Sequence, residues 1–364
     1  MRFAAFFRRA HVTCVQIGLA SASVLALSAA PAQNASLHPQ DAPTAEPTIA
    51  GVAYVDAPAR FAAIGYESDY DPKTLTLTVR AKEQTQTGQE LVFTAEKREA
   101  RLDGMRVFLG EPAILHRGRL YLATVDLERF IQPILHPARL PARALRTIVI
   151  DAGHGGIDTG AQNTTHLFDE KVFALDVSLR LQALLGDERW RVLQTRTDDR
   201  FVPLGARAEF ANKEKADLFI SVHFNAVANN STVRGTETYV LTPRFQRSTS
   251  SLKTTDDDKV KQVGNRHDVW NAVLGYHMHR ELLTRLKTSD RGLKRARFAV
   301  LRLVDCPAVL VEAGYLSNDE EALRIADEEY REEIAKSLYA AILAFDQARA
   351  AAEVEAIMVP NRWR

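Results

Sequence analysis

The sequence predicts an α/β protein with a mostly parallel central sheet and helices on both faces, preceded by a small β-rich domain. Two patterns predict this organisation. From residue 147 onward, short apolar runs alternate with longer helical segments, which is typical of a parallel sheet covered on both sides. Residues 49–136 instead contain short runs with a period of two, separated by Asp-Gly and Arg-Gly pairs, which is typical of antiparallel hairpins.

The first 32 residues have the composition of a secretory signal peptide. Three arginines precede an apolar run at 17–30, no acidic residue occurs, and Ala-Pro-Ala offers small residues for cleavage. An uncleaved membrane anchor is the alternative, although the run is short for about 30 Å of hydrocarbon. The general secretory and twin-arginine routes both stay open. We therefore predict a periplasmic or extracellular, wall-associated protein with no stable membrane insertion after cleavage.

The composition is that of an ordinary globular protein. The chain has 364 residues, 47 basic and 46 acidic side chains, and a net charge of +1. This balance gives no electrostatic reason to bind a polyanion, so we expect no nucleic-acid partner. Cys14 would leave with the signal peptide, and Cys306 alone cannot form an internal disulfide.

The part of the chain before residue 147 divides into three segments. Residues 33–48 are polar and proline-spaced and are expected to form a linker. Residues 49–136 form the predicted β-rich domain, which ends in an expected helix at 125–135. Ligand binding, positioning and a spacer role are all open for this domain. A second proline-containing linker follows at 137–146.

Residues 147–347 form the predicted catalytic domain, followed by a tail at 348–364. A polar, Ser- and Thr-rich stretch at 242–265 is expected to be a mobile surface loop. Amphipathic helices are expected at 170–186 and 332–348. Strands are expected at 147–153, 190–196, 217–226, 236–242, 297–303 and 308–314.

Four ionisable side chains lie where predicted strands end or a helix begins. His154 follows the run "IVIDAG" and stands among glycines, His223 lies in "LFISVHFNA", Glu312 ends "AVLVEAG", and Glu170 opens a helix. In open parallel sheets, ligands bind beyond the carboxyl ends of the strands. These four side chains are therefore expected to meet at one edge of the sheet.

Taken singly, some of these residues have simpler explanations. His223 alone would be a hydrogen-bonded core histidine, and Glu170 a carboxylate stabilised by a helix dipole. Glu312 is harder to explain. It ends an almost entirely apolar strand, and burying an unpaired carboxylate costs on the order of several kcal/mol. A metal ion or another cationic partner is needed to explain it.

Several motifs between residues 147 and 345 together identify a family. The motifs "IDAGHGGIDTGA", "DEK", "TRTDDRFVPLGARAEFAN", "ADLFISVHFNA", "GTETYVL", "RGLK" and "PAVLVEAGYLSN" occur in the order found in zinc-dependent N-acetylmuramoyl-L-alanine amidases, which this region resembles. The chain departs from the usual family pattern at Ala152, where proline is common. Some members insert a helix that covers the zinc until a partner releases it. Here that position holds only the polar stretch 242–265.

The resemblance implies a single zinc ion with His154, Glu170 and His223 as ligands, and Glu312 as the catalytic carboxylate. Asn225, Arg291 and Lys294 are further candidates for contact with a stem peptide. The implied substrate is peptidoglycan, cleaved between the lactyl group of N-acetylmuramic acid and L-alanine. A zinc peptidase acting on another amide of the stem peptide, and an inactive wall-binding protein, are the alternatives. A regulatory protein partner is left open.

Overall fold

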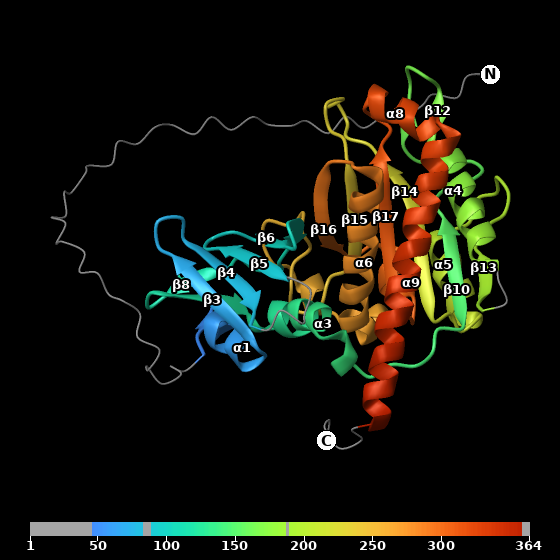
Figure 1. The fold of residues 1–364 in the computed structure, drawn as a ribbon. Coiled ribbons are helices and arrows are strands. Elements are labelled where there is room, and N and C mark those ends of the chain that lie inside the picture. The colour runs from blue at the N-terminus through green and yellow to red at the C-terminus, as the bar shows by residue number, and fades with distance from the viewer. Residues whose placement is uncertain (1–45, 83–88, 187–188, 359–364) are drawn as a thin grey trace, which may run out of the picture. The chain divides into compact units, whose positions relative to one another are not determined.

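The computed structural model describes residues 46–82, 89–186 and 189–358, with side chains through residue 353 (Figure 1). The predicted signal peptide and almost all of the predicted linker at 33–48 lie outside these ranges. The described residues belong to one compact unit. Within them, no helix is both long and apolar enough to cross a bilayer.

Six strands of the predicted catalytic domain form one part of a larger sheet. Their order across the sheet is β13-β10-β14-β17-β15-β16. The first four, β13, β10, β14 and β17, pair in parallel. The bounds are β10 Thr147–Ala152, β13 Arg191–Gln194, β14 Leu218–Asn225, β15 Thr236–Leu241, β16 Asp290–Ala296 and β17 Ala308–Tyr315.

The expectation of a mostly parallel sheet is wrong for the sheet as a whole. Strand β15 runs antiparallel to β17, so the direction reverses beside the strand that carries Glu312. On its far side, β16 pairs in parallel with β7 (Met105–Phe108), through Leu293 and Val107. Strands β7, β6 (Glu99–Leu102), β5 (Glu90–Thr94), β4 (Thr76–Ala81) and β3 (Tyr66–Asp71) then follow, all antiparallel. The fold is therefore a mixed α/β fold.

The hairpins predicted in the β-rich region are present. Asp103 and Gly104 both have positive φ between β6 and β7, and Arg117 and Gly118 do so between β8 (Ile114–His116) and β9 (Arg119–Ala123). Two successive positive φ angles are the mark of a type I′ hairpin turn. Strands β8 and β9 form a second sheet with β1 (Thr48–Ile49) and β2 (Val52–Asp56).

The remaining elements of the β-rich region are helical. A short helix, α1 (Ala57–Ala63), follows β2. The helix expected at 125–135 is confirmed as a continuous run of α2 (Thr124–Asp126), a π-helical turn (Leu127–Ile131) and α3 (Gln132–Leu135).

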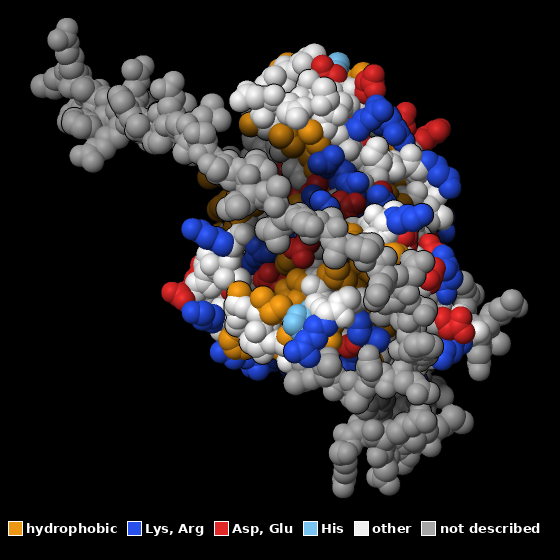
Figure 2. Space-filling model, turned by 90° about the vertical axis from the view of Figure 1, so that its left-hand side faces the viewer, with side chains coloured by type: hydrophobic (Ala, Val, Ile, Leu, Met, Phe, Trp, Pro, Cys, Tyr) orange, Lys and Arg blue, Asp and Glu red, His pale blue; other side chains and the backbone are white. Residues whose placement is uncertain are grey.

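In the view of Figure 2, acidic and basic side chains are interspersed with hydrophobic ones, so the face shown has no large patch of a single charge.

Helices cover both faces of the sheet. Helices α4 (Glu170–Leu184), α6 (Asp268–Leu286) and α9 (Glu328–Met358) lie side by side on one face and bury apolar side chains in a shared core (Figure 1). Helices α5 (Leu204–Lys213) and α7 (Ala299–Leu303) pack on a second core that contains Val149, Phe219 and Leu310. The parallel strands are thus buried on both faces, as their apolar sequences require.

The strand expected at 297–303 is wrong, because residues 299–303 form helix α7. Val300, Leu301 and Val304 are buried at a helical spacing, and a short apolar run does not distinguish strand from helix. The strand lies instead at β16, whose sequence "DRGLKRA" is too polar to signal a buried strand.

The stretch 242–265 is held in place, in contrast to the mobile loop that was expected. It contains a 3-10 turn at Asp256–Lys259, and the next one, Val263–His267, leads into α6. Asp258 pairs with Arg297. Arg98, from the β-rich region, donates hydrogen bonds to the backbone carbonyls of Arg247, Ser248, Thr249 and Ser251. The polar residues of the stretch 242–265 thus serve these contacts as well as contact with solvent.

The segments at the domain borders are also ordered where described. In the predicted linker 137–146, the indole of Trp270 donates to the carbonyl of Pro141, and Arg349 donates to that of Arg143. Helix α9 continues through the first part of the predicted tail, to Met358. The exact division of residues 49–347 into two domains stays a prediction.

Candidate metal centre

The loop after β10 brings a histidine to the carboxyl edge of the sheet. His154 has a φ of 58°, in the left-handed region that few non-glycine residues adopt. A side chain at Gly153 would place Cβ 2.4 Å from Cε1 of His223, and one at Gly160 would lie 2.5 Å from a Glu170 oxygen. The glycines therefore leave the space in which two imidazoles and a carboxylate approach each other.

The three predicted ligands, His154, Glu170 and His223, lie close together. Oε1 of Glu170 lies 3.1 Å from Nε2 of His154 and 2.8 Å from Nδ1 of His223. One donor atom from each of the three residues lies within 4.8 Å of the others, and no other such group of histidine, cysteine and carboxylate side chains occurs among the described residues. Two imidazoles and one carboxylate form a donor set that zinc accepts.

The surroundings of Glu170 favour its ionised form although the carboxylate is buried. Burial opposes ionisation, but hydrogen bonds with His154 and His223 outweigh it and hold the pKa of Glu170 well below its usual range. Backbone N–H groups add to this, since those of Ala161 and Phe224 donate to its two oxygens at 2.7 and 3.0 Å. The site therefore supplies a preformed anionic ligand between two imidazoles.

A buried ion pair fixes the strand end that leads to His154. Asp151 is fully buried and accepts hydrogen bonds from Arg207 at 2.8 Å, Thr195 at 2.6 Å and Ser221 at 2.7 Å. Arg207 also donates to the carbonyl oxygen of His154 at 2.7 Å. The guanidinium thus ties the His154 loop to the sheet.

A second arginine supports the same loop from its other side. The guanidinium of Arg196 donates to the carbonyl oxygens of Ala152, at 3.0 Å, and of Gly153, at 2.6 Å. Burial lowers the pKa of Arg196, and the neighbouring positive charge of Arg207 lowers it further. The two arginines thus hold the backbone of the loop from two sides.

Glu312 lies on β17 between the metal ligands and β15. Its Cα pairs in register with that of His223 on one side and that of Glu237 on the other. Its Oε2 atom is buried and has no hydrogen-bond partner among the described residues. Burial raises the pKa of Glu312 well above its usual value, the negative charges of Glu170 and Glu237 raise it further, and Lys294 opposes them. An orphaned carboxylate oxygen at this edge is suited to proton transfer.

A family model described as "N-acetylmuramoyl-L-alanine amidase" matches residues 148–344, more than half of the chain. The chain belongs to this family. The matched region contains all four of the residues grouped from the sequence, which are His154, Glu170, His223 and Glu312.

Individual relatives agree with the family match. The chain is 31% identical to N-acetylmuramoyl-L-alanine amidase AmiC of Escherichia coli, over 60% of this chain and 58% of that protein. It is 30% identical to probable N-acetylmuramoyl-L-alanine amidase AmiB of Haemophilus influenzae, over 66% of this chain and 59% of that protein. The chain thus spans less than two thirds of the length of these relatives.

Solved structures of similar proteins exist. AmiC2 of Nostoc punctiforme, an N-acetylmuramoyl-L-alanine amidase, is 30% identical over 56% of this chain and 97% of that one, with a TM-score of 0.47. A score below 0.5 does not by itself define a shared fold.

In this amidase-family chain, sequence reasoning missed Glu237. It is 2% exposed and lies on β15, directly opposite Glu312. The motif "GTETYVL" contains Glu237, but this motif served only to identify the family and not to assign a role to the glutamate. The available signal was a glutamate inside a short strand rich in β-branched and aromatic residues, in phase with Tyr239.

The three predicted substrate contacts gather around that residue. Lys294 and Arg291 donate to Oε1 of Glu237 at 2.6 and 3.1 Å, and Asn225 donates to Oε2 at 3.4 Å. The three side chains therefore converge beside Glu312 from two strands, Asn225 from β14 and Arg291 and Lys294 from β16. Contact with a substrate stays a prediction for each of them.

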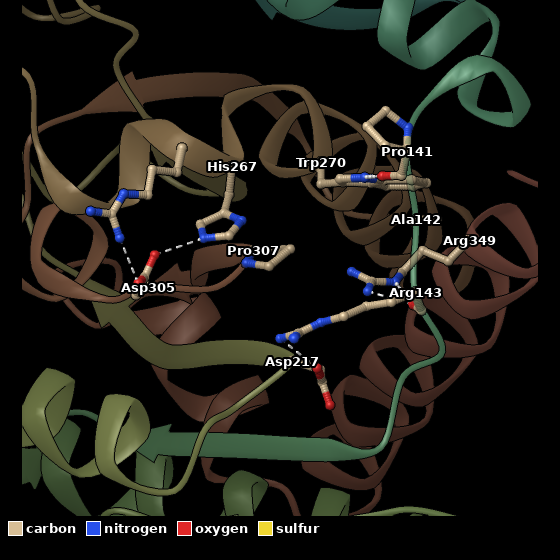
Figure 3. Close-up of a pocket in the computed structure, with 10 residues that line it drawn as sticks. Pro141, Ala142, Arg143, Asp217, His267, Trp270, Asp305, Pro307 and Arg349 are labelled. Carbon is tan, nitrogen blue, oxygen red and sulfur yellow. Dashed lines mark hydrogen bonds and ion pairs between the residues drawn. The ribbon is translucent and has the colours of Figure 1, made fainter. Parts of the chain in front are cut away.

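A pocket of about 490 Å³ lies at the opposite edge of the sheet, where β14 and β17 begin (Figure 3). Asp217 pairs with Arg143 at 2.9 Å, and Asp305 pairs with His267 at 3.0 Å. Trp270 also lines this pocket. None of the four residues of the metal centre does, so the hollow and the candidate chemistry are separate features.

Proposed function

We propose that this chain is an exported zinc amidase of the cell wall, which hydrolyses the amide between the lactyl group of N-acetylmuramic acid and L-alanine. One observation carries the proposal: an orphaned carboxylate, Glu312, lies one strand away from a preformed site of two imidazoles and a carboxylate. Family membership supports the substrate. The signal-like segment at 1–32 supports export to the periplasm or the exterior.

The residues divide the reaction between them. His154, Glu170 and His223 would hold a zinc ion, which would supply a Lewis acid for the amide carbonyl. Glu312 takes a proton from the attacking water while the water oxygen bonds to the carbonyl carbon. When the C–N bond breaks, Glu312 returns the proton to the departing amine of L-alanine. The products are a glycan with a free lactyl carboxylate and a stem peptide with a free amino terminus.

Arg291 is the best supported of the proposed substrate contacts. Glu237 engages its Nε, and the guanidinium lies over the ring of Tyr315, 5.2 Å from the centroid. About a third of the side chain is exposed, and no described residue accepts from its two Nη groups. A planar guanidinium with free donors suits a carboxylate of the stem peptide. Lys294 and Asn225 would act beside it.

Product analysis tests this function. The mature protein is incubated with purified peptidoglycan, with and without a chelator, and the soluble products are identified by mass. We expect intact stem peptides beginning with L-alanine, no release with the chelator, and recovery when zinc is added back. Fragments cut inside the stem peptide would instead identify a zinc peptidase. Binding without release would identify an inactive wall-binding protein.

A further inference from the structure

Two glutamates face each other on neighbouring strands beside the metal centre. Glu237 on β15 and Glu312 on β17 are register partners in an antiparallel pair. Like charges directly opposite in a sheet are destabilising. The strand pair therefore needs cations or hydrogen-bond donors nearby, and how these donors are shared decides which of the two carboxylates stays free.

The donors go to Glu237. Its Oε1 accepts from Lys294 at 2.6 Å, Arg291 at 3.1 Å and Tyr315 at 2.5 Å. Its Oε2 accepts from Tyr239 at 2.5 Å and from Asn225. Burial opposes ionisation of Glu237, but Lys294 and the other donors outweigh it and lower its pKa. Five donors thus surround one buried carboxylate.

Glu312 receives none of these donors. Its Oε2 is buried without a partner, and no described residue donates a hydrogen bond to the carboxylate. The ammonium of Lys294 lies 2.6 Å from Oε1 of Glu237, whose Cα pairs in register with that of Glu312. The lysine is mostly buried, with its ammonium 5.8 Å from the ring centroids of Phe108 and Tyr239. Its ammonium therefore binds the carboxylate that stands next to Glu312 in the sheet and makes no hydrogen bond to Glu312.

We propose that Glu237 is a positioning residue, which binds Lys294 and thereby keeps the nearest ammonium from pairing with Glu312. The proposal rests on the proposed function, in which Glu312 must accept a proton. A lysine bonded to Glu312 would occupy the oxygen that the water needs and would weaken the base. Glu237 removes this competitor with a carboxylate that takes no part in the reaction.

Paired variants test the proposal. In Glu237→Gln the amide attracts the ammonium far less, so Lys294 is expected to turn to Glu312. We expect kcat to fall about tenfold or more, with KM within about threefold of wild type, because the loss falls on proton transfer. The zinc content should stay at one ion per chain. Adding Lys294→Met to Glu237→Gln should recover most of the kcat of the Lys294→Met single variant.

This rescue separates positioning from a merely structural role. If Glu237 only stabilised the fold, removing a second partner would leave the double variant as slow as Glu237→Gln or slower, and that result would overturn the proposal. Wild-type kcat in Glu237→Gln would overturn it too. Glu111→Gln is the matched control, since Glu111 is another buried glutamate paired to a cation, Arg247, at 3.1 Å. Its kcat should stay near wild type.

A crystal structure of Glu237→Gln gives a readout that does not depend on turnover. We expect Nζ of Lys294 within hydrogen-bond distance of Glu312, and an unmoved lysine would contradict the proposal. If this variant does not fold, Glu237→Asp, which keeps the charge, should fold and retain more kcat than Glu237→Gln/Lys294→Met. The reverse order would contradict the proposal. Absence of stem-peptide release by wild type would refute the proposed function alone, because the crystal structure would still test where Lys294 binds.

Discussion

The two edges of the catalytic sheet treat their carboxylates differently. At the edge where β14 and β17 begin, Asp217 pairs with Arg143 and accepts from the backbone N–H groups of Arg146 and Thr147. At the edge where these strands end, Glu312 has a buried oxygen with no partner. Because an unpartnered buried polar atom costs stability, the second arrangement calls for an explanation, and a catalytic role is one. Glu312 therefore differs both from Asp217 and from its own neighbours Glu170 and Glu237, because no donor pairs with its Oε2 atom.

The largest expected effect tests the unpaired edge. Glu312→Gln keeps the shape of the side chain but cannot accept a proton, so we expect kcat for stem-peptide release to fall about 10²- to 10⁴-fold. Zinc content measured by atomic absorption should stay at that of wild type. Asp217→Ala at the opposite edge is the control, with a lower melting temperature and unchanged kcat at 25 °C. Comparable activity losses in both variants would remove the distinction between the edges.

A second variant measures how much a buried ion pair contributes to the free energy of unfolding at the edge where β10, β14 and β17 end. Arg207→Met leaves Asp151 buried without its cation, so we expect the free energy of unfolding to fall by about 3–5 kcal/mol in urea denaturation. Arg143→Met also removes a partner of an aspartate, but the Arg143 side chain is 72% exposed. That change should cost about 1 kcal/mol or less. Equal losses in the two variants would contradict the expectation that the buried pair Asp151–Arg207 contributes more to stability than the exposed pair Asp217–Arg143.

The smallest expected effect concerns Asp268, the first residue of α6, near the edge of the sheet where β14 and β17 begin. Burial raises its pKa to about 6, although a hydrogen bond from Asn265 opposes the rise. The folded protein therefore holds this proton more tightly than the unfolded chain, and the associated stability is lost as pH rises from about 4 through 6. Asp268→Asn should melt a few degrees higher than wild type at pH 8, less any small loss from the helix dipole.

The same comparison at pH 4 provides the control. There both the folded and unfolded forms of wild type bind the proton more fully, so the melting temperatures of Asp268→Asn and wild type should converge in differential scanning calorimetry. A difference that grows toward acid pH would show that the carboxylate is fully compensated, like its neighbours at this edge.

Parts of this fold and site were predictable because they depend on local patterns. The apolar runs of β10, β14 and β17 mark buried strands, and strand ends in an α/β sheet gather at one edge. This is why His154, His223 and Glu312 could be grouped from the sequence, and Glu170 with them. The two hairpin turns were predictable for a similar reason, since Asp-Gly and Arg-Gly favour positive φ.

Other parts depend on contacts between distant residues. Whether β15 runs parallel or antiparallel to β17 is not encoded in its own sequence. The charges of β16 conceal a strand, because Glu237 neutralises Lys294, and Asp126, far earlier in the chain, neutralises Arg295. Arg98 orders a polar stretch about 150 residues away, which composition alone marks as mobile.

The pairing of β16 with β7 has a consequence for the behaviour of the molecule in solution. An outermost strand with unsatisfied backbone groups invites other chains to add to it and so to aggregate. Val107 and Arg106 of β7 occupy this flank of β16, the first by register pairing and the second by donating its N–H to Asp290 at 2.6 Å. The front strands therefore cover the flank of β16 and move the open edge of the sheet out to β3.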